Sequence, residues 1–216
     1  MIRAIIFDLD GVICSTDEFH YEAWKTLADK LGIYFDRKIN ERLRGVSRMD
    51  SLEIVLERAD RTFSDDEKLK LADEKNECYK KLLMKMSPDD LSDEVKNTLL
   101  TLRKMGYPMA IGSSSKNTKQ ILKNIGLEGF FDAVSDGTNI SRSKPDPEVF
   151  LCAAEYLGEE PSECLVVEDA DAGIIAAKRG NMSAAGIGSA KEHKDADFKL
   201  ESFKDLIEIL NDQKGY

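Results

Sequence analysis

The chain has 216 residues, of which 42% are hydrophobic and 33% charged. Division by a domain length of roughly 150 residues predicts one domain with an insert, and this apolar content excludes a largely disordered chain. The formal net charge is −10, whereas proteins that bind duplex nucleic acid need a basic surface to displace counterions. We therefore expect no nucleic-acid partner.

The amino terminus and the cysteines bear on where the protein works. Residues 1–7 are apolar over too short a stretch for a signal peptide or a membrane span, because Asp8 and Asp10 follow at once. The four cysteines form no C-x-x-C pair, which predicts reduced thiols rather than a zinc site or a disulfide framework. We expect a cytoplasmic protein with no membrane partner, and a monomer.

Three short apolar runs predict buried strands that each end at a polar cluster. Residues 2–7 end at Asp8, residues 109–111 lead to serines at positions 113–115, and residues 165–167 lead to Glu168 and Asp169. The chemistry of the protein is therefore expected where these three strands end.

Helical patterns separate the strands from about residue 89 onward. Apolar residues recur at helical spacing over residues 95–102 and 121–125. Alternating strands and helices predict βαβ units, and so an α/β fold with a Rossmann-like parallel sheet covered on both faces. Glycines suited to a left-handed helix end are expected at Gly32, Gly106, Gly126, Gly158 and Gly180.

Residues 16–88 interrupt this alternation with a helical insert. Apolar stripes at helical spacing run over residues 19–31, 52–59 and 69–83. The insert ends near residues 87–90, Ser-Pro-Asp-Asp, where proline and turn-forming residues mark a boundary. We therefore expect an α/β core made of residues 1–15 and 89–216, with an inserted helical domain over residues 16–88.

The acidic residues that follow the strands predict a metal site. Loops at the carboxyl ends of parallel strands converge on one crevice, so residues far apart in sequence become neighbours. Carboxylates crowded into one crevice raise one another's pKa unless a cation holds them ionised. Oxygen ligands favour a hard ion, and Mg²⁺ suits them better than zinc. The predicted metal ligands are Asp8, Asp10, Glu168 and Asp169.

Four residues predict phosphoryl-transfer chemistry in the same crevice. With a metal charge and the Lys144 ammonium nearby, Asp8 can stay anionic as a nucleophile. Asp10 can protonate a leaving oxygen or deprotonate an attacking one, and Ser113 can hydrogen-bond the phosphoryl group. The predicted catalytic residues are Asp8, Asp10, Ser113 and Lys144.

Four short motifs span nearly the whole predicted core. They are Phe7-Asp8-Leu9-Asp10-Gly11-Val12, the strand end at Ser113, Lys144-Pro145-Asp146-Pro147 and Glu168-Asp169-Ala170. In this order they resemble the four motifs of the haloacid dehalogenase-like superfamily. The resemblance implies a phosphoryl-transfer core, and the position of the insert resembles a helical cap of that superfamily.

Details of the insert resemble the β-phosphoglucomutase branch of this superfamily. Residues 45–48 resemble the specificity loop of that branch's cap, and residues 113–117 resemble its loop for the distal phosphate. Two positions depart from the commoner pattern, since Ser114 is often alanine there and Asp171 is an extra carboxylate beside the metal motif. The resemblance implies that substrate is bound by Thr16, His20, Trp24, Gly45, Val46, Ser47, Arg48, Lys75, Ser115, Lys116 and Asn117.

The residue types themselves suit two phosphate sites. Ser115, Lys116 and Asn117 open a predicted helix, whose exposed amides and positive dipole end favour an anion. Arg48 can make a two-pronged contact with a phosphate from the insert. One phosphate at Asp8 and another at Lys116 would suit a sugar bisphosphate.

The resemblance implies an isomerase. It would be a phosphoglucomutase that interconverts β-D-glucose 1-phosphate and β-D-glucose 6-phosphate through an aspartyl phosphate and a sugar bisphosphate. A phosphatase of the same superfamily, hydrolysing a small sugar phosphate, is the alternative, because Asp8, Lys144 and the metal serve both. A phospho-aspartate signalling receiver is a third hypothesis, but receivers phosphorylate an aspartate at a later strand and have no helical insert.

Purely structural interpretations compete at several positions. Asp8 with Asp10 fits a turn at a strand end, and Glu168 with Asp169 fits the start of a helix, where the dipole favours negative charge. Exposed surface positions fit Arg48 and Lys116. His20 and Lys75 fit either exposed charges or partly satisfied residues on a helix face. Trp24 fits a core position, and Ser47 fits a helix N-cap.

Overall fold

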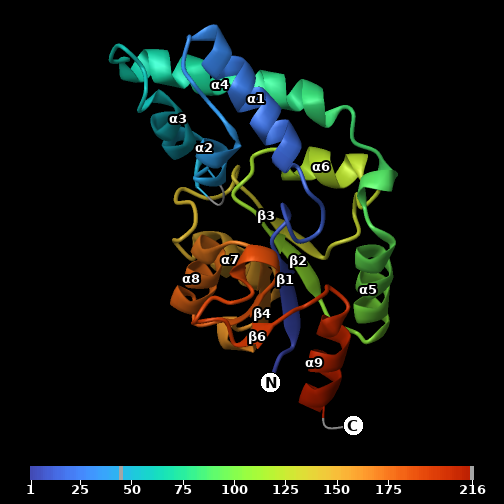
Figure 1. The fold of residues 1–216 in the computed structure, drawn as a ribbon. Helices are drawn as coiled ribbons and strands as arrows, with labels where there is room; N and C mark the ends of the chain where they lie inside the picture. Colours follow the sequence, from blue (N-terminus) through green and yellow to red (C-terminus); the bar gives the residue numbers. More distant parts are fainter. Residues whose placement is uncertain (44–45, 215–216) are drawn as a thin grey trace. The chain divides into compact units, whose positions relative to one another are not determined.

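The computed structural model describes residues 1–43 and 46–214, the last two of these without their side chains. The chain forms two compact units. Met1–Ser15 and Ser87–Tyr216 form the first, which we call the core unit, and Thr16–Met86 form the second, which we call the helical unit. Figure 1 follows the elements of each unit along the chain.

A parallel sheet forms the centre of the core unit. In the described residues its six strands lie in the order β3-β2-β1-β4-β5-β6, and every neighbouring pair is parallel. This strand order is that of a Rossmann-like sheet, which confirms the predicted fold class. The strands are β1 (Ala4–Phe7), β2 (Met109–Gly112), β3 (Ala133–Ser135), β4 (Cys164–Glu168), β5 (Ser183–Gly186) and β6 (Phe198–Lys199).

Strand β1 lies in the core because all four of its residues are buried. Its side chains alternate between the two faces of the sheet. On one face Ile6 joins an apolar cluster with Phe150 of helix α7 (Glu148–Leu157). On the other face the Phe7 ring packs against the ring of Phe203. A strand buried on both faces explains the continuous apolar run that precedes Asp8.

Helices cover both faces of the sheet, and Figure 1 shows α7 and α8 on one side with α5 and α9 on the other. Capping fixes where they begin: Ser92 accepts a hydrogen bond from the backbone N–H of Val95 at the start of α5. Besides α7, the core unit contains α5 (Asp93–Lys104), α6 (Thr118–Asn124), α8 (Asp171–Arg179), α9 (Asp205–Lys214), and 3₁₀ helices at Pro88–Asp90, Pro161–Glu163 and Gly188–Ala190.

Four of the five predicted helix-ending glycines adopt the left-handed conformation. Gly32, Gly106, Gly126 and Gly158 have φ between +69° and +83°. Gly180 does not, because its φ is −80°. The left-handed residue is Asn181, with a φ of +58°, and asparagine tolerates this conformation better than most residues. The prediction for Gly180 is therefore wrong by one residue.

The helical unit contains the helices that its apolar stripes predict. α4 packs against both α1 and α3, around a core that includes Trp24, Leu27 and Leu52. Ser64 and Glu67 form a reciprocal capping box that begins α4. The helices of this unit are α1 (Asp17–Lys30), α2 (Arg37–Glu41), α3 (Arg48–Leu56) and α4 (Asp65–Leu83).

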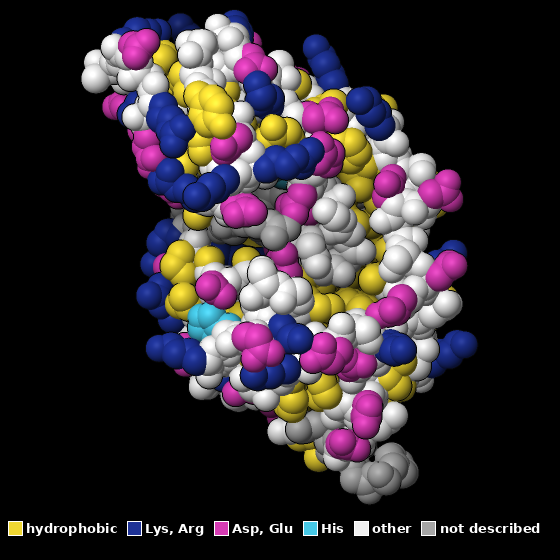
Figure 2. Space-filling model, viewed as in Figure 1, with side chains coloured by type: hydrophobic (Ala, Val, Ile, Leu, Met, Phe, Trp, Pro, Cys, Tyr) yellow, Lys and Arg dark blue, Asp and Glu magenta, His cyan; other side chains and the backbone are white. Residues whose placement is uncertain are grey.

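The surface carries charges of both signs. Figure 2 shows lysine and arginine side chains interspersed with aspartate and glutamate over the visible face. Exposed ion pairs such as Arg37 with Glu18 are typical of it, and solvent screening leaves each of them a small contribution to stability. Among the described residues, none of the helices is both long and apolar enough to span a membrane.

Candidate active site

The site lies where the strand order of the core unit reverses. β1 pairs with β2 on one side and with β4 on the other, and ligands of such sheets bind outside the carboxyl ends of the strands at this point. Asp8 directly follows β1, and its backbone N–H donates to the carbonyl of Val167 in β4 at 3.0 Å. Glu168 is the last residue of β4. The fold therefore brings the first and last predicted acidic motifs side by side.

Lys144 joins these two acidic residues. Its Nζ donates to Oδ1 of Asp8 and, at 2.6 Å, to Oε1 of Glu168. The three residues are buried, with exposed fractions of 5%, 7% and 1% for Lys144, Asp8 and Glu168. The ammonium also lies 4.6 Å from the centre of the Phe150 ring, a cation–π distance. Residues 136 positions apart in sequence thus share one buried ion-pair cluster.

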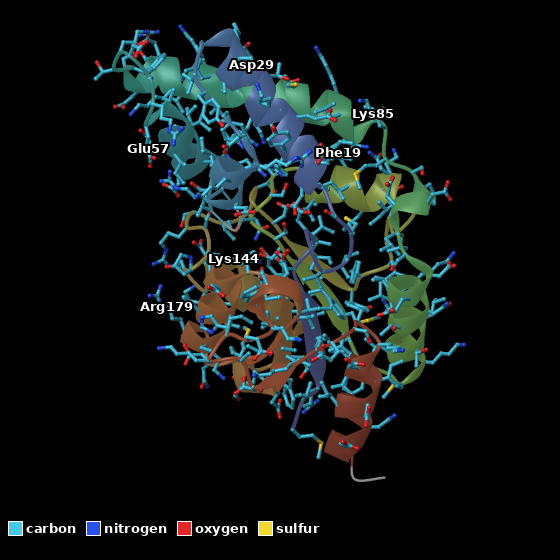
Figure 3. All side chains as sticks on the ribbon, viewed as in Figure 1. Phe19, Asp29, Glu57, Lys85, Lys144 and Arg179 are labelled. Atoms are coloured by element: carbon cyan, nitrogen blue, oxygen red, sulfur yellow. The ribbon has the colours of Figure 1, made fainter. Side chains whose placement is uncertain are left out.

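The segment that carries Lys144 is held by hydrogen bonds on both sides. Arg179 of α8 donates from Nη1 to the carbonyl of Pro145 at 3.0 Å, and Figure 3 labels Lys144 and Arg179 on the core unit. The carboxylate of Glu148 accepts from the backbone N–H groups of Ser141 and Arg142. The lysine therefore projects from an ordered turn rather than from a free loop.

The buried charges of this cluster do not balance. Burial lowers the pKa of Lys144, but Asp8 and Glu168 outweigh it and raise that pKa above its ordinary value, so the lysine stays protonated. Burial also raises the pKa of Asp8 well above its ordinary value; Lys144 opposes this shift, while Glu168 and Asp169 add to it. The single ammonium of Lys144 thus interacts with more than one carboxylate, and a further cation would favour the ionised forms of these carboxylates.

Two glycines pack directly against the acidic side chains. Gly11 has a φ of +88°, and a Cβ atom built there would lie 2.2 Å from Oδ2 of Asp169. A Cβ at Gly173 would lie 1.9 Å from Oε1 of Glu168. Because real Cβ contacts are not this close, any larger residue would displace a carboxylate. Asp169 therefore lies against the loop that follows β1, beside Asp8 and Asp10.

Asp10 lies in a tight turn after β1. The backbone N–H of Gly11 donates to the carbonyl of Cys14 at 2.7 Å, and the N–H groups of Ile13 and Cys14 both donate to the carbonyl of Leu9. Asp10 is half-buried within this turn. The turn interpretation of Asp8 and Asp10 is thus correct for the backbone, and it leaves the role of their side chains open.

Ser113 follows β2 and begins the second predicted loop. It is buried, its backbone N–H donates to the carbonyl of Ser135 in β3 at 3.1 Å, and its Oγ accepts from the N–H of Ser115 at 3.2 Å. The N–H of Asn117 likewise donates to Oγ of Ser115. The amides of Ser115 and Asn117 are therefore already bonded within the loop, so the expectation of exposed amides is wrong for these two. Lys116 is exposed and Asn117 buried.

Glu168 and Asp171 also serve the start of α8. Oε2 of Glu168 accepts from the backbone N–H of Ala170 at 2.8 Å, while its Oε1 is bonded to Lys144. Asp171 is exposed in the first turn of α8, where the helix dipole favours negative charge. The structural interpretation of these acids and their part in the charge cluster are therefore compatible.

The donor chemistry of the site fits a hard metal ion. Its donors are carboxylate oxygens, which Mg²⁺ prefers, and the surplus of buried negative charge would favour a cation. Nevertheless, the part of the chain that the structure describes contains no three His, Cys, Asp or Glu side chains gathered as a metal site. In this arrangement the ammonium of Lys144 lies between Asp8 and Glu168.

The helical unit gathers a second set of predicted residues. Oγ1 of Thr16 accepts from the Tyr79 hydroxyl at 2.9 Å. Nζ of Lys75 lies 2.9 Å from Nδ1 of His20 and 4.7 Å from the ring centres of both Trp24 and Tyr79. Lys75 is 3% exposed, so the interpretation of this lysine as a surface charge is wrong. Trp24 is a core residue, as its structural interpretation predicts.

The loop before α3 is described in part. Gly45 lies outside the described residues, and Val46 is half-buried. Ser47 is the N-cap of α3 and accepts a hydrogen bond from the N–H of Asp50, which confirms its structural interpretation. Arg48 is half-buried and donates from Nη2 to Oδ1 of Asn76 at 2.9 Å. It is therefore not an ordinary exposed cation.

His20 gives a prediction on stability and pH. Burial, followed by Lys75 and Arg48, holds the pKa of His20 well below its ordinary value of 6.5. As the pH falls through 6.5, His20 binds a proton in the unfolded chain but not in the folded protein. The free energy of unfolding therefore decreases. His20→Gln should flatten this loss between pH 7 and pH 5, by at most about 1.4 kcal/mol per pH unit for one proton.

Urea unfolding of wild type and His20→Gln at several pH values measures this difference. The slope of unfolding free energy against pH decides the outcome, because the substitution also changes the absolute stability. Equal slopes for the two proteins would show that His20 titrates normally in the folded state.

Sequence patterns missed three residues of these clusters. Asn76 and Tyr79 contact predicted residues in the helical unit, and Phe150 covers Lys144 in the core unit. Lys75 and Asn76 are buried on the same helix as Ala72, so polar residues within an apolar helical stripe were the available signal. Phe150 carried none, because it belongs to the core.

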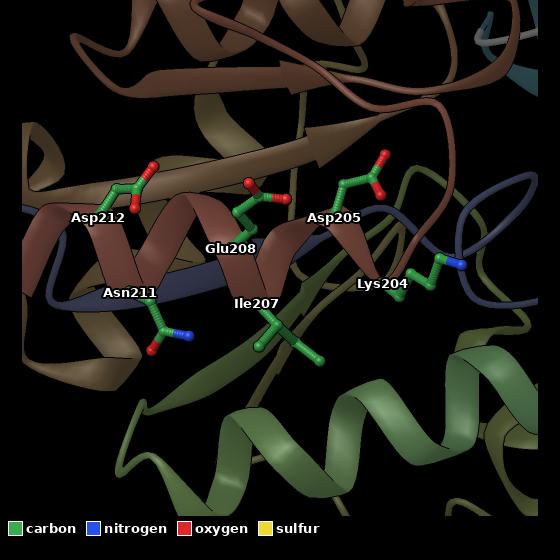
Figure 4. A pocket seen from close by; sticks show the side chains of 6 residues that line it. All are labelled: Lys204, Asp205, Ile207, Glu208, Asn211 and Asp212. Atoms are coloured by element: carbon green, nitrogen blue, oxygen red, sulfur yellow. The ribbon is translucent and has the colours of Figure 1, made fainter. Parts of the chain in front are cut away.

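A surface pocket lies elsewhere on the core unit. Figure 4 shows that it is lined by side chains of α9 and of the residue before it. Most of these side chains are polar or charged, and none belongs to the predicted site. The lining residues are Lys204, Asp205, Ile207, Glu208, Asn211 and Asp212.

Comparisons with known proteins show the family of the chain. The family model of haloacid dehalogenase-like hydrolases matches residues 2–181. A β-phosphoglucomutase of Bacillus subtilis is 39% identical over 215 residues, covering 98% of this chain and 95% of that protein. A fructose-1-phosphate phosphatase of Escherichia coli is 32% identical over 186 residues, covering 85% of this chain and 95% of that protein.

A solved structure matches nearly the whole length of the chain. The crystal structure of a β-phosphoglucomutase from Clostridium difficile superimposes with a TM-score of 0.91 at 38% sequence identity, covering 99% of this chain and 97% of that one. The family model spans most of the chain, and the relatives match nearly all of it. The chain therefore belongs to the haloacid dehalogenase-like hydrolase family.

Proposed function

We propose that the protein is a β-phosphoglucomutase, an isomerase that interconverts β-D-glucose 1-phosphate and β-D-glucose 6-phosphate. The observation that carries this proposal is the buried cluster in which Lys144 joins Asp8 and Glu168 at the switch point of the sheet. The B. subtilis and C. difficile relatives that bear this name match nearly the whole chain. They support the choice of reaction and substrate.

Asp8 is the nucleophile in this proposal. Its carboxylate oxygen attacks the phosphorus of a sugar phosphate, the bond to the sugar oxygen breaks, and an aspartyl phosphate forms. Lys144 favours the ionised form of this carboxylate, against the rise in its pKa that burial causes, and would face the phosphoryl oxygens with a positive charge. Ser113, at the neighbouring strand end, donates its hydroxyl to the same group. The protein is therefore a phosphoprotein during turnover.

Asp10 is the general acid and base. A sugar alkoxide is a poor leaving group, so the departing oxygen needs a proton, which Asp10 supplies. In the return step Asp10 removes a proton from the hydroxyl that attacks the aspartyl phosphate. The phosphoryl group of the aspartyl phosphate passes to the free 6-hydroxyl of a bound β-D-glucose 1-phosphate, so that a sugar 1,6-bisphosphate forms and Asp8 is released. Asp8 then attacks the phosphate at position 1, which restores the aspartyl phosphate and releases glucose 6-phosphate.

Asp8, Asp10, Glu168 and Asp169 would hold Mg²⁺. When bound, the ion neutralises charge on the transferring phosphoryl group. The raised pKa of Asp8, which burial causes and which Glu168 and Asp169 increase, supports a need for a further cation. The all-oxygen donor set supports magnesium over zinc.

The helical unit serves as a cap in this proposal. Arg48 and the loop of Ser115, Lys116 and Asn117 would bind the phosphate that is not reacting, as a charge-assisted clamp. The buried position of Lys75 supports a role beyond solubility. The remaining proposed contacts with the sugar phosphate come from Thr16, His20, Trp24, Gly45, Val46 and Ser47.

A phosphatase of the same family is the alternative. In that case water, rather than a second sugar oxygen, attacks the aspartyl phosphate, and the same core residues serve. The E. coli relative, a fructose-1-phosphate phosphatase at 32% identity, favours this candidate. Only the cap can distinguish the two reactions.

The proposal places the enzyme in the cytoplasm as a monomer that acts on small molecules. All four cysteines, each within the described residues, carry free thiols, which suits a reducing compartment. The net charge of −10 does not favour a nucleic-acid partner.

Arg48→Ala separates the mutase from the phosphatase. A charge-assisted hydrogen bond contributes about 1.5–3 kcal/mol, so loss of the clamp should slow isomerisation roughly ten- to a hundredfold or more. Phosphorylation of Asp8 by acetyl phosphate involves no second phosphate and should stay nearly unchanged. Coupled detection of glucose 6-phosphate measures the first activity, and phosphoenzyme formation measures the second.

Arg61→Ala is the matched control for this variant. Arg61 belongs to the same helical unit but is exposed and paired with Glu67, so both activities should stay at the wild-type level. If folded Arg48→Ala isomerises as fast as wild type, the clamp is wrong. If wild type itself releases free phosphate without isomerising the sugar phosphate, the phosphatase becomes the better proposal.

A further inference from the structure

The guanidinium of Arg48 is held by an uncharged side chain. Nη2 of Arg48 donates to Oδ1 of Asn76 at 2.9 Å, across 28 positions of sequence. Arg48 begins α3, and Asn76 lies in the second half of α4. Because α4 packs against α3, this bond ties the first residue of one helix to the middle of another.

Asn76 occupies a position where a polar residue carries a cost. It is 9% exposed and lies on the buried face of α4, among Ala72, Lys75 and Tyr79. A buried amide is unfavourable unless its hydrogen-bonding groups are satisfied. The hydrogen bond from Arg48 satisfies the amide oxygen of Asn76 and so offsets part of the cost of burying this polar side chain.

The chemistry of an amide suits an arginine that must keep its charge available. An aspartate at this position would form a two-pronged ion pair with the guanidinium and would compete with a phosphate for it. Asn76 fixes the direction of the side chain through an uncharged hydrogen-bond partner and does not neutralise the positive charge. The acids whose charges act on Arg48, Asp73 and Glu77, are exposed on α4, and Glu77 is paired with Lys80 at 2.8 Å.

We infer that Asn76 is a positioning residue that directs the Arg48 guanidinium at the non-reacting phosphate of the substrate, and that it does so without a carboxylate partner for Arg48 among the described residues. The inference rests on the proposed function for the identity of that phosphate. The bond between Asn76 and Arg48 itself does not depend on it. Asn76 touches no reacting atom in this account, and it acts only through Arg48.

Three variants of Asn76 test this inference. Asn76→Asp keeps the size of the side chain but pairs the guanidinium, so KM for β-glucose 1-phosphate should rise tenfold or more. Asn76→Ala removes the hydrogen bond that orients the Arg48 guanidinium but introduces no carboxylate to pair with it, so the KM of this variant should rise less. Asn76→Gln retains an amide oxygen and should regain part of the loss. None of the three should change phosphorylation of Asp8 by acetyl phosphate.

The Arg48→Ala background shows whether Asn76 acts through Arg48. In that background Asn76→Asp should cause no further rise in KM, because the guanidinium that it would capture is absent. Asn97→Asp, the same change at an exposed position of α5, controls for added negative charge. An equal rise in KM with and without Arg48 would overturn the inference, as would an Asn76→Asp enzyme with wild-type KM.

A direct measurement keeps the inference separate from the proposed function. Nuclear magnetic resonance of the ¹⁵N-labelled Arg48 guanidinium should show slowed rotation of its NH₂ groups in wild type and faster rotation in Asn76→Ala. If the wild-type protein neither isomerises glucose phosphates nor binds the 1,6-bisphosphate, the proposed function fails, and these resonances then decide the inference. Identical spectra of the two proteins would overturn it.

Discussion

Replacing Asp8 with asparagine should lower every phosphoryl-transfer activity of the protein by at least about ten-thousandfold. The amide is a far weaker nucleophile than the carboxylate and cannot form the aspartyl phosphate. It also removes a proposed metal ligand. Both isomerisation of β-glucose 1-phosphate and formation of a phosphoenzyme from acetyl phosphate should disappear, and fluoride complexes of beryllium or aluminium should no longer bind as phosphoryl mimics.

The fold should survive this substitution, because Lys144 keeps its bond to Glu168. Asp132→Asn is the matched control. Asp132 lies before the amino end of β3, whereas Asp8 follows the carboxyl end of β1, and the Asp132 carboxylate pairs with Arg103. That variant should retain wild-type activity. Thermal unfolding of all three proteins checks their integrity, and near-native turnover of folded Asp8→Asn would remove Asp8 as the nucleophile.

Replacing Asp10 with asparagine should have the second largest effect, and the effect should depend on the donor. Transfer to and from sugar oxygens needs a proton and should slow by roughly a hundred- to ten-thousandfold. Acetyl phosphate has a good leaving group, so phosphorylation of Asp8 by it should change far less. Single-turnover rates with each donor measure the two steps separately.

Equal slowing with both donors would contradict the acid and base role of Asp10. The residue would then act mainly through the metal, because a lost ligand affects every donor alike. Retained turnover with sugar phosphates would exclude both roles.

The central strands were predictable because strands that are buried on both faces are apolar along their whole length. β1 reads Ala-Ile-Ile-Phe and β4 reads Cys-Leu-Val-Val-Glu, and continuous apolar runs are typical of strands buried on both faces. β5 reads Ser-Ala-Ala-Gly, which has no β-branched residue and no strand propensity. It is a strand because β4 pairs with it, and a single sequence does not display that pairing.

The site of the core unit was predictable for a related reason. Asp8, Glu168 and Ser113 each follow or end a strand, and the parallel topology brings strand ends together. The position of Lys144 between Asp8 and Glu168 depends on the course of the segment before α7, which no periodicity describes. The sequence motif around Lys144 predicted that this lysine takes part in the site. The structure shows that it contacts Asp8 and Glu168.

The contacts within the helical unit were harder to predict. Arg48 meets Asn76 and His20 meets Lys75 because α1 and α3 both pack against α4. The apolar stripes predict the helices but not how they are paired or rotated against one another. Lys75, on the buried face of α4, therefore resembled a surface charge in the sequence, although it is 3% exposed.

The most direct test of the account follows both products at once. The protein is incubated with Mg²⁺ and β-glucose 1-phosphate, with a trace of β-glucose 1,6-bisphosphate, and phosphorus nuclear magnetic resonance records glucose 6-phosphate and free phosphate over time. We expect glucose 6-phosphate to accumulate to equilibrium while free phosphate stays low and bisphosphate is conserved. Stoichiometric release of free phosphate without glucose 6-phosphate would contradict this expectation and identify a phosphatase.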